Sequence, residues 1–155
     1  MMEALPVILL TAALVAAVWT DQRQHRIPNA LVLTMLVSGF VVRVGLEGTA
    51  GLTDGLLGLL AGFLVLIFPY LRGGMAAGDV KLLAAVGVLV GPVTVVIAGL
   101  IATLVGASIG GVLIALQRYR ENGVTAEQLL TRRFPFAAAI ALGSATALIV
   151  RGLLL

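Results

Sequence analysis

The sequence predicts an all-α integral membrane protein with six transmembrane helices, on the grounds of its composition, its hydropathy and the spacing of its polar breaks. Of its 155 residues, 61% are hydrophobic and 11% are charged, whereas a soluble domain has about 45–50% apolar and about 25% charged residues. A mean hydropathy of +1.16 also excludes a disordered chain, which would be poor in apolar residues. At about 20 residues for each membrane span, the chain has room for six helices.

The first three apolar stretches are 4–20, 30–44 and 55–71. We interpret the first as a retained span and not as a cleaved signal peptide, because Glu3 precedes it without a basic region and no small-residue cleavage site follows it. Arg43 lies near the end of the second stretch, where its long side chain is expected to reach the membrane interface.

The next part of the chain is a charge-free run from residue 82 to residue 117, which we expect to form two helices. As one helix this run would be ~54 Å long, whereas the hydrocarbon core of a membrane is ~30 Å thick. Gly91 and Pro92 are typical turn residues, and they divide the run into a short fourth span and a long fifth span. The sixth span is predicted over 134–150, and Arg151 follows it.

The distribution of basic residues predicts the orientation. Eight of the ten basic residues lie in the first, third and fifth loops, which share one side of a six-span protein: Arg23, Arg26, Arg72, Lys81, Arg118, Arg120, Arg132 and Arg133. Only Arg43 and Arg151 lie on the other side. Because cytoplasmic loops are rich in Lys and Arg, we expect these three loops in the cytoplasm and both termini outside.

The residue inventory limits the chemistry. The chain has no cysteine and one histidine, His25, which excludes disulfides, thiol catalysis, cysteine-bound zinc and a site with several histidine ligands. We therefore expect no metal, no cofactor and no nucleic-acid partner. Asp and Glu are the main acid–base groups that remain.

Two of the seven acidic residues differ from the others. Five lie in termini, outer loops or the polar fifth loop, where we expect solvated charges: Glu3, Glu47, Asp54, Glu121 and Glu127. Asp21 and Asp79 each stand at a cytoplasmic helix end beside apolar sequence. The fourth span is so short, at ~16 Å, that Asp79 is expected to lie below the headgroups. An ionisable residue at that depth is costly and indicates a functional site.

Two carboxylates at one membrane level are suited to peptide hydrolysis. Like charges held close together favour one shared proton. One carboxylate can then deprotonate a water while the other donates a proton to the peptide carbonyl oxygen. The alternatives are structural: Asp21 caps its helix or pairs with Arg23 or Arg26, and Asp79 pairs with Lys81.

Two segments contain these aspartates, DQRQHRIPN at 21–29 and GMAAGDVKL at 74–82. Together they resemble the two motifs of the type IV prepilin peptidases, membrane-embedded aspartic proteases of the Gly-x-Gly-Asp type. The family's first motif is an Asp followed by a basic-Ile-Pro-Asn run, and its second is Gly-x-Gly-Asp-x-Lys. The similarity extends over nearly the whole chain in motif order, span count and orientation, including the Phe-Pro-Phe at 134–136 that opens the last span.

The resemblance implies that Asp21 and Asp79 are the catalytic pair. Gly78 matches the second glycine of the motif, whereas Ala76 replaces the first. A glycine at that place would let the backbone move or approach the substrate more closely, so the resemblance leaves the effect of Ala76 on activity open.

Four further residues match the motifs and are candidate supporting residues. Arg26, Pro28 and Asn29 belong to the run after Asp21, and Lys81 follows Asp79. We expect Pro28 to open the second span in its first turn, and Asn29 either to cap that helix or to orient a carboxylate. Lys81 lies ~200° around the helix from Asp79, so we expect it to face the headgroups.

The resemblance further implies the substrates and the location. They would be prepilin or pseudopilin precursors, whose short basic leader is cytoplasmic and is followed by an apolar helix in the membrane. The enzyme would be a multi-pass protein of the bacterial inner membrane, in contact with lipid, serving pilus assembly or secretion. Without an inserted cysteine-containing domain, residues 1–155 resemble the peptidase-only form of Flp/Tad-type systems, a single domain without methyltransferase activity.

Two other classes of protein remain open from the sequence. A small proton- or ion-coupled transporter subunit would use the same two aspartates as ion sites, but it does not explain why both lie on one side beside basic loops. A non-catalytic membrane scaffold would tolerate the loss of both aspartates.

Overall fold

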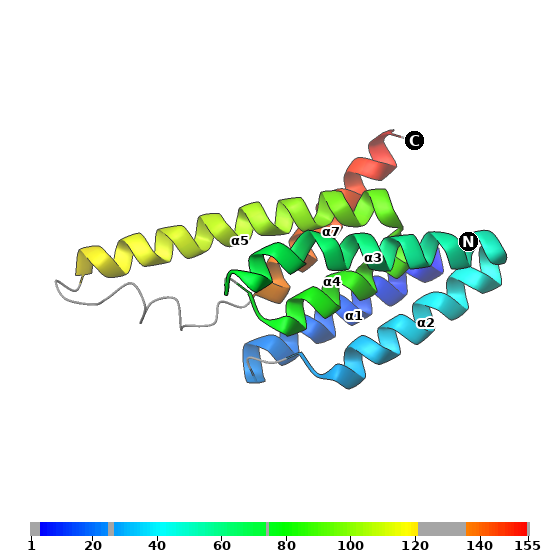
Figure 1. The fold of residues 1–155 in the computed structure, drawn as a ribbon, viewed down its shortest axis with the longest axis horizontal. Coiled ribbons are helices and arrows are strands. Elements are labelled where there is room, and N and C mark those ends of the chain that lie inside the picture. The colour runs from blue at the N-terminus through cyan, green and yellow to red at the C-terminus, as the bar shows by residue number, and fades with distance from the viewer. Residues whose placement is uncertain (1–3, 25–26, 74, 121–135, 155) are drawn as a thin grey trace.

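A computed structural model describes residues 4–24, 27–73, 75–120 and 136–154. These residues form six α-helices: α1 (Ala4–Gln24), α2 (Asn29–Glu47), α3 (Thr49–Leu71), α4 (Ala77–Val90), α5 (Pro92–Arg120) and α7 (Phe136–Leu154). The predicted all-α fold is confirmed, and each predicted apolar stretch corresponds to one helix. The helices run alternately in opposite directions, so α1 begins and α7 ends at the same end of the bundle (Figure 1).

Two glycines make the turns at the end of the bundle where α1 begins. Gly48 has φ +61° and joins α2 directly to α3, and its N–H donates to the Val44 carbonyl oxygen at 2.9 Å. Gly91 has φ +83° and joins α4 to α5, with its N–H donating to the Gly87 carbonyl oxygen at 2.9 Å. Other residues rarely adopt positive φ. The turn predicted at Gly91 and Pro92 is therefore confirmed.

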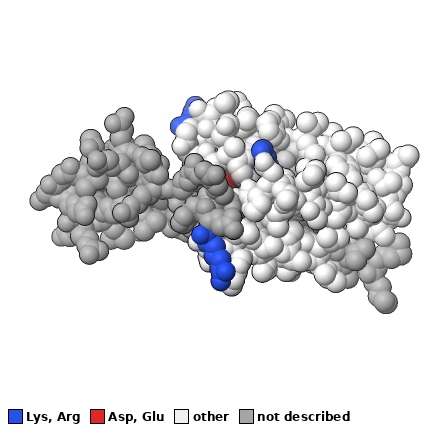
Figure 2. All heavy atoms as spheres, turned by 90° about the horizontal axis from the view of Figure 1, so that it is seen from below, with Lys and Arg blue, Asp and Glu red and all other residues white. Residues whose placement is uncertain are grey.

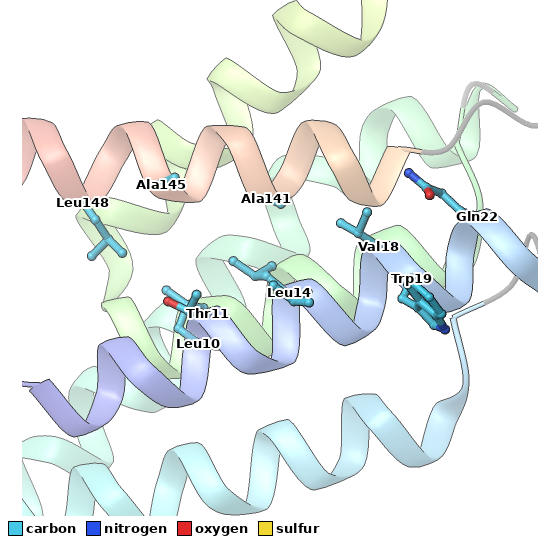
Figure 3. A pocket seen from close by; sticks show the side chains of 10 residues that line it. Leu10, Thr11, Leu14, Val18, Trp19, Gln22, Ala141, Ala145 and Leu148 are labelled. Carbon is cyan, nitrogen blue, oxygen red and sulfur yellow. The ribbon is translucent and has the colours of Figure 1, made fainter.

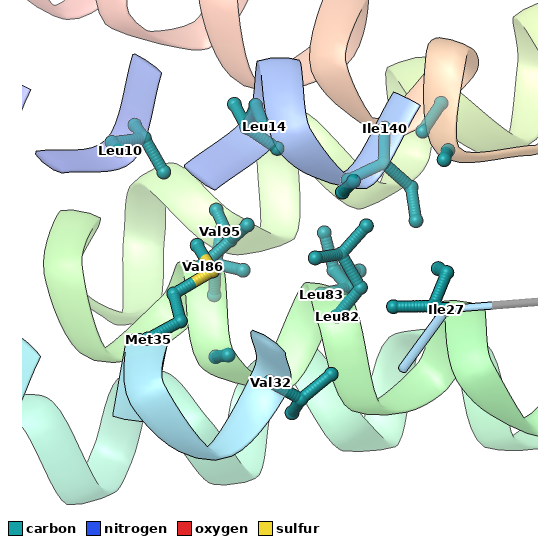
Figure 4. Close-up of a cluster of buried hydrophobic side chains, with 14 of the residues drawn as sticks. Leu10, Leu14, Ile27, Val32, Met35, Leu82, Leu83, Val86, Val95 and Ile140 are labelled. Atoms are coloured by element: carbon teal, nitrogen blue, oxygen red, sulfur yellow. The ribbon is translucent and has the colours of Figure 1, made fainter. Parts of the chain in front are cut away.

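Helix α4 is the centre of the bundle. All of its residues from Leu82 to Val90 are buried, and apolar side chains from α1, α2, α5 and α7 surround it (Figure 4). Its closest neighbour is α3, where Gly58 faces Gly87. A Cβ atom at either glycine would collide with the carbonyl oxygen of the other. Such close backbone contact is typical of helices that associate in lipid, and it fixes the position of α4.

The outer surface of the bundle is also apolar. Large side chains on several helices are more than half exposed, among them Val15, Leu33, Phe68 and Leu104. Within the described residues, α2 and α3 are long and apolar enough to cross a membrane, and shorter apolar segments cover Pro92–Ser108 and Ala137–Ile149. The number of membrane spans and their orientation stay predictions.

Candidate active site

Asp21 lies in the last turn of α1 and is buried, with 8% of its surface exposed. We expected the first helix to end before Asp21, but α1 continues to Gln24, because Gln and Arg are good helix formers. Asp21 therefore shares the buried face of α1 with Leu14 and Ala17, at helical spacing. Helix α1 contacts α2, α4 and α7.

Asp79 lies in the first turn of α4 and is 5% exposed. Its Oδ2 accepts a hydrogen bond from the Ala76 backbone N–H at 3.3 Å, and its own N–H donates to the Ala76 carbonyl oxygen at 3.1 Å. Ala76 is the N-cap residue and has no side-chain oxygen, so the carboxylate of Asp79 alone provides the side-chain hydrogen bond at this helix start. The positive end of the helix dipole also favours a carboxylate here.

The two aspartates belong to one site. Helix α1 contacts α4, and both aspartates are buried at the ends of these two helices. Two buried carboxyl groups thus lie together at the end of the bundle where α1 ends and α4 begins, which we call the aspartate end. No group of three or more His, Cys, Asp or Glu side chains suited to a metal ion occurs among the described residues.

The cations near these aspartates have other contacts. The guanidinium carbon of Arg23 lies 4.3 Å from the centroid of the Trp19 ring, a cation–π arrangement. The ammonium group of Lys81 donates to Asn29 Oδ1 at 3.2 Å, and Lys81 is exposed. Lys81 therefore binds the side-chain amide oxygen of Asn29. The alternative interpretation from the sequence, in which Lys81 pairs with Asp79, is not what the structure has.

Asn29 and Pro28 differ from the sequence expectations. Pro28, and not Asn29, is the N-cap of α2, and no side chain caps this helix. The Pro28 carbonyl oxygen accepts from the Leu31 N–H at 3.1 Å, so the proline lies one position before the first turn. Asn29 is the first helical residue, and its side chain links α2 to Lys81 of α4. The capping role expected for Asn29 is wrong.

Gly78 allows the two motif segments to pack closely. A Cβ atom at Gly78 would lie 3.3 Å from Ile27 Cβ, which is tight but not a collision. Ala76, by contrast, is exposed, and its φ of −85° and ψ of 149° suit any residue. Arg26 lies outside the described residues.

Sequence reasoning missed a cluster at the opposite end of the bundle. Arg43 does not extend to an exposed position: it is 6% exposed, and Nη1 lies 2.8 Å from Glu47 Oε2 and 3.3 Å from Asp54 Oδ2. Glu47 and Asp54 are half-exposed, which agrees with the expectation of solvated charges, and both also pair with Arg43. The four-residue spacing of Arg43 and Glu47 was a usable signal.

The surface of the bundle separates these regions. Among the cations with described side chains, the exposed ones are Arg23, Arg72 and Lys81. Arg23 lies in the last turn of α1, Arg72 directly follows α3, and Lys81 lies near the start of α4. In Figure 2 the basic side chains and a small acidic spot lie toward one end of the described surface, and the rest of the described surface on that face is uncharged.

Comparisons with known proteins agree with the two motifs. The model of the type IV leader peptidase family matches residues 8–111, which include both aspartates. The prepilin leader peptidase/N-methyltransferase of Aeromonas hydrophila is 38% identical over 125 residues, covering 76% of this chain and 43% of that protein. The proteins of the same name from Burkholderia pseudomallei (strain 1026b) and Bacillus subtilis (strain 168) are 37% and 30% identical, covering 94% and 92% of this chain and 46% and 54% of theirs.

This chain spans about half the length of the curated relatives that it matches. No solved structure matches it significantly.

Proposed function

This chain belongs to the type IV leader peptidase family, and we propose that it is an aspartic endopeptidase that removes the short basic leader from prepilin-like or pseudopilin-like precursors. The observation that carries the proposal is that two buried aspartates, one from each motif, lie at the same end of the bundle on two helices that contact each other. The relatives are named as peptidases, and nothing in these comparisons supports the transporter alternative.

In the proposed mechanism, Asp21 and Asp79 share one proton, because two neighbouring carboxylates cannot both ionise cheaply. The ionised carboxylate takes a proton from water, whose oxygen attacks the peptide carbon. The protonated carboxyl group donates its proton to the carbonyl oxygen, giving a tetrahedral intermediate. Collapse of the intermediate breaks the C–N bond, and the amine leaves with a proton. The Ala76 N–H holds the Asp79 carboxylate in position during these steps.

The proposal includes a membrane arrangement. All six helices would cross or enter the inner membrane, with the aspartate end at its cytoplasmic boundary and the start of α1 and the end of α7 outside. The positions of Arg23, Arg72 and Lys81 support this orientation, because basic residues favour the cytoplasmic side. A reporter fused after Arg120 should be cytoplasmic, and a periplasmic signal at this point would contradict the six-span arrangement.

We further propose that residues 1–155 act as one membrane-embedded peptidase domain, as in Flp/Tad-type systems. The support is the sequence itself, which lacks the paired cysteines expected of the methyltransferase domain. Mass spectrometry of a precursor processed by this chain should therefore show a shortened product with an unmethylated N-terminus.

The main test is cleavage of a co-expressed prepilin. Asp21→Asn and Asp79→Asn keep the size of each side chain but remove its acid–base function. Each single variant should leave the precursor uncleaved while the protein remains in the membrane at the wild-type level. Asp54→Asn, which neutralises a carboxylate at the opposite end, is the matched control and should process the precursor. Normal cleavage by both single variants would refute the proposed function.

A further inference from the structure

An apolar groove opens on the surface of the bundle between α1 and α7 (Figure 3). Its volume is about 380 Å³. Leu10, Leu14 and Val18 of α1 line one side, and Ala141, Ala145 and Leu148 of α7 line the other. The mechanism described above makes no use of this groove.

The groove leads to the proposed catalytic site. Its lining on α1 extends from Leu10 to Gln22, which is ~18 Å along a helix, and Gln22 directly follows Asp21. The groove therefore begins beside the aspartate end and continues toward the opposite end of the bundle. A substrate cut at the aspartates would place the residues after its cleavage site along this path.

The walls of the groove suit a helix. Ala141 and Ala145 are four residues apart, and small residues at that spacing allow another helix to approach closely in lipid. The opposite face of α7 is held firmly on α5, where a Cβ atom at Gly143 would collide with the Ala98 carbonyl oxygen. The wall that contains the two alanines is thus preformed.

The polarity of the groove changes along its length. Apolar side chains line most of it, and the hydroxyl group of Thr11 is already used, since it donates to the Val7 carbonyl oxygen at 2.7 Å. The amide of Gln22 stands at the aspartate end (Figure 3). An amide can hydrogen-bond to exposed backbone groups, which an extended segment beside a scissile bond presents and an apolar helix does not. A lipid acyl chain has no backbone groups for the Gln22 amide to bind, and its binding would not require a groove that begins beside the aspartates.

We propose that this groove docks the apolar helix that follows the cleavage site of the precursor, and that Gln22 positions the extended segment between that helix and the scissile bond. The proposal rests on the proposed function. In this proposal helix α1 has two roles. Asp21 lies on its buried face, and Val18 and Gln22 line the groove on an adjoining face, where they would contact the substrate.

The first experiment fills the groove. Ala145→Phe should raise the KM for full-length precursor in detergent at least tenfold and leave kcat within twofold, because the substrate loses its docking site but the aspartates are unchanged. Leu142→Phe, which places the same aromatic side chain at an exposed position of α7 outside the groove, should alter neither value. An unchanged KM in Ala145→Phe would mean that the groove holds lipid only, and would overturn the proposal.

The second experiment does not depend on cleavage or on tolerance of a large side chain. Because the chain has no cysteine, Ala145→Cys and Leu142→Cys each introduce a unique thiol. In the uncleaving Asp79→Asn background, oxidation should link Ala145→Cys, and not Leu142→Cys, to a precursor with one cysteine in its apolar helix. Equal linkage at both positions, linkage at neither, or linkage only to a second copy of this chain would overturn the docking proposal.

These results are separable from the proposed function. If Asp79→Asn abolishes cleavage while Ala145→Phe leaves KM unchanged, the peptidase assignment stands and the groove assignment fails. If Asp79→Asn cleaves normally, the peptidase assignment itself fails.

Discussion

Carboxylates have opposite environments at the two ends of the helical bundle. At one end, Glu47 and Asp54 share the buried guanidinium group of Arg43. At the other end, Asp21 and Asp79 are themselves buried, and Asp79 has no ion pair with a basic residue among the described residues. A buried carboxyl group without a cation is costly to ionise, and such groups are retained where chemistry needs them.

Helix α4 connects these two ends. Asp79 lies in its first turn, and Gly91 after its last turn lies against the Arg43 cluster: a Cβ atom at Gly91 would be 3.1 Å from Arg43 Nη2. The ion-paired end thus holds the same helix that positions a proposed catalytic carboxylate. If this division is correct, neutralising either buried aspartate should reduce cleavage without lowering stability, and removing the Arg43 side chain should lower stability without reducing cleavage.

The largest expected effect comes from the aspartate end. Asp79→Asn or Asp21→Asn should lower the rate of prepilin cleavage at least ~10³-fold, because removal of a proton-transfer group loses about 10²–10⁴-fold by itself and the remaining carboxyl group then has no partner acid. The midpoint of thermal unfolding in detergent should stay the same or rise, since an uncharged amide replaces a buried carboxyl group whose ionised form is costly to bury. A clear fall in that midpoint would show that the pair stabilises the fold.

Much of this comparison could be predicted from the sequence. The charge-free run with Gly91 and Pro92 predicted two helices. The positions of Asp21 and Asp79 at helix ends beside apolar sequence distinguished them from the other acidic residues. The ion pair of Arg43 with Asp54 could not be predicted in this way, because it needs the tight turn at Gly48.

Contacts between segments far apart in the sequence could not be predicted from it either. Asn29 and Lys81 are 52 residues apart, and no local pattern relates them. Local signals therefore identified the two carboxyl groups that we propose to react, whereas the partners of the remaining polar groups depend on how the helices pack.

The second expected effect tests the opposite end. Arg43→Ala should lower the free energy of unfolding by about 2 kcal/mol, because it removes a buried side chain and leaves two carboxylates together; the value is below that of a fully buried pair, since Glu47 and Asp54 are half-exposed. The rate of cleavage for each folded molecule should stay within twofold. Denaturant unfolding in detergent and cleavage normalised to folded protein measure both quantities. Loss of cleavage by the folded molecules would show that the Arg43 end is also needed for catalysis, which contradicts the division between the two ends.

A smaller effect is expected at Gly78, where stability and cleavage should change together. In Gly78→Ala the new methyl group would meet Ile27 Cβ at 3.3 Å, so the segment before α2 must shift by a few tenths of an ångström. We expect a several-fold loss of cleavage and a stability loss of about 1 kcal/mol, at the low end of overpacking costs. Ile27→Gly removes the Cβ atom that the new methyl group meets, so restoration of cleavage for each folded molecule by this change in the Gly78→Ala background would show that the contact with Ile27 is the cause. Failure of this double variant to recover would place the cause elsewhere.

The smallest effect is expected where the chain departs from the family motif. Ala76 is exposed and has ordinary backbone angles, and its contribution to the site is the backbone N–H that reaches Asp79. Ala76→Gly keeps that N–H. Glycine is the better N-cap residue by several tenths of a kcal/mol, but it adds a similar entropic cost of folding, so the two changes offset. We expect cleavage within twofold of the wild type and stability within ~0.5 kcal/mol. A several-fold rise in the cleavage rate would mean that backbone freedom before Asp79 limits the reaction, and that the aspartate end must open further than this structure shows.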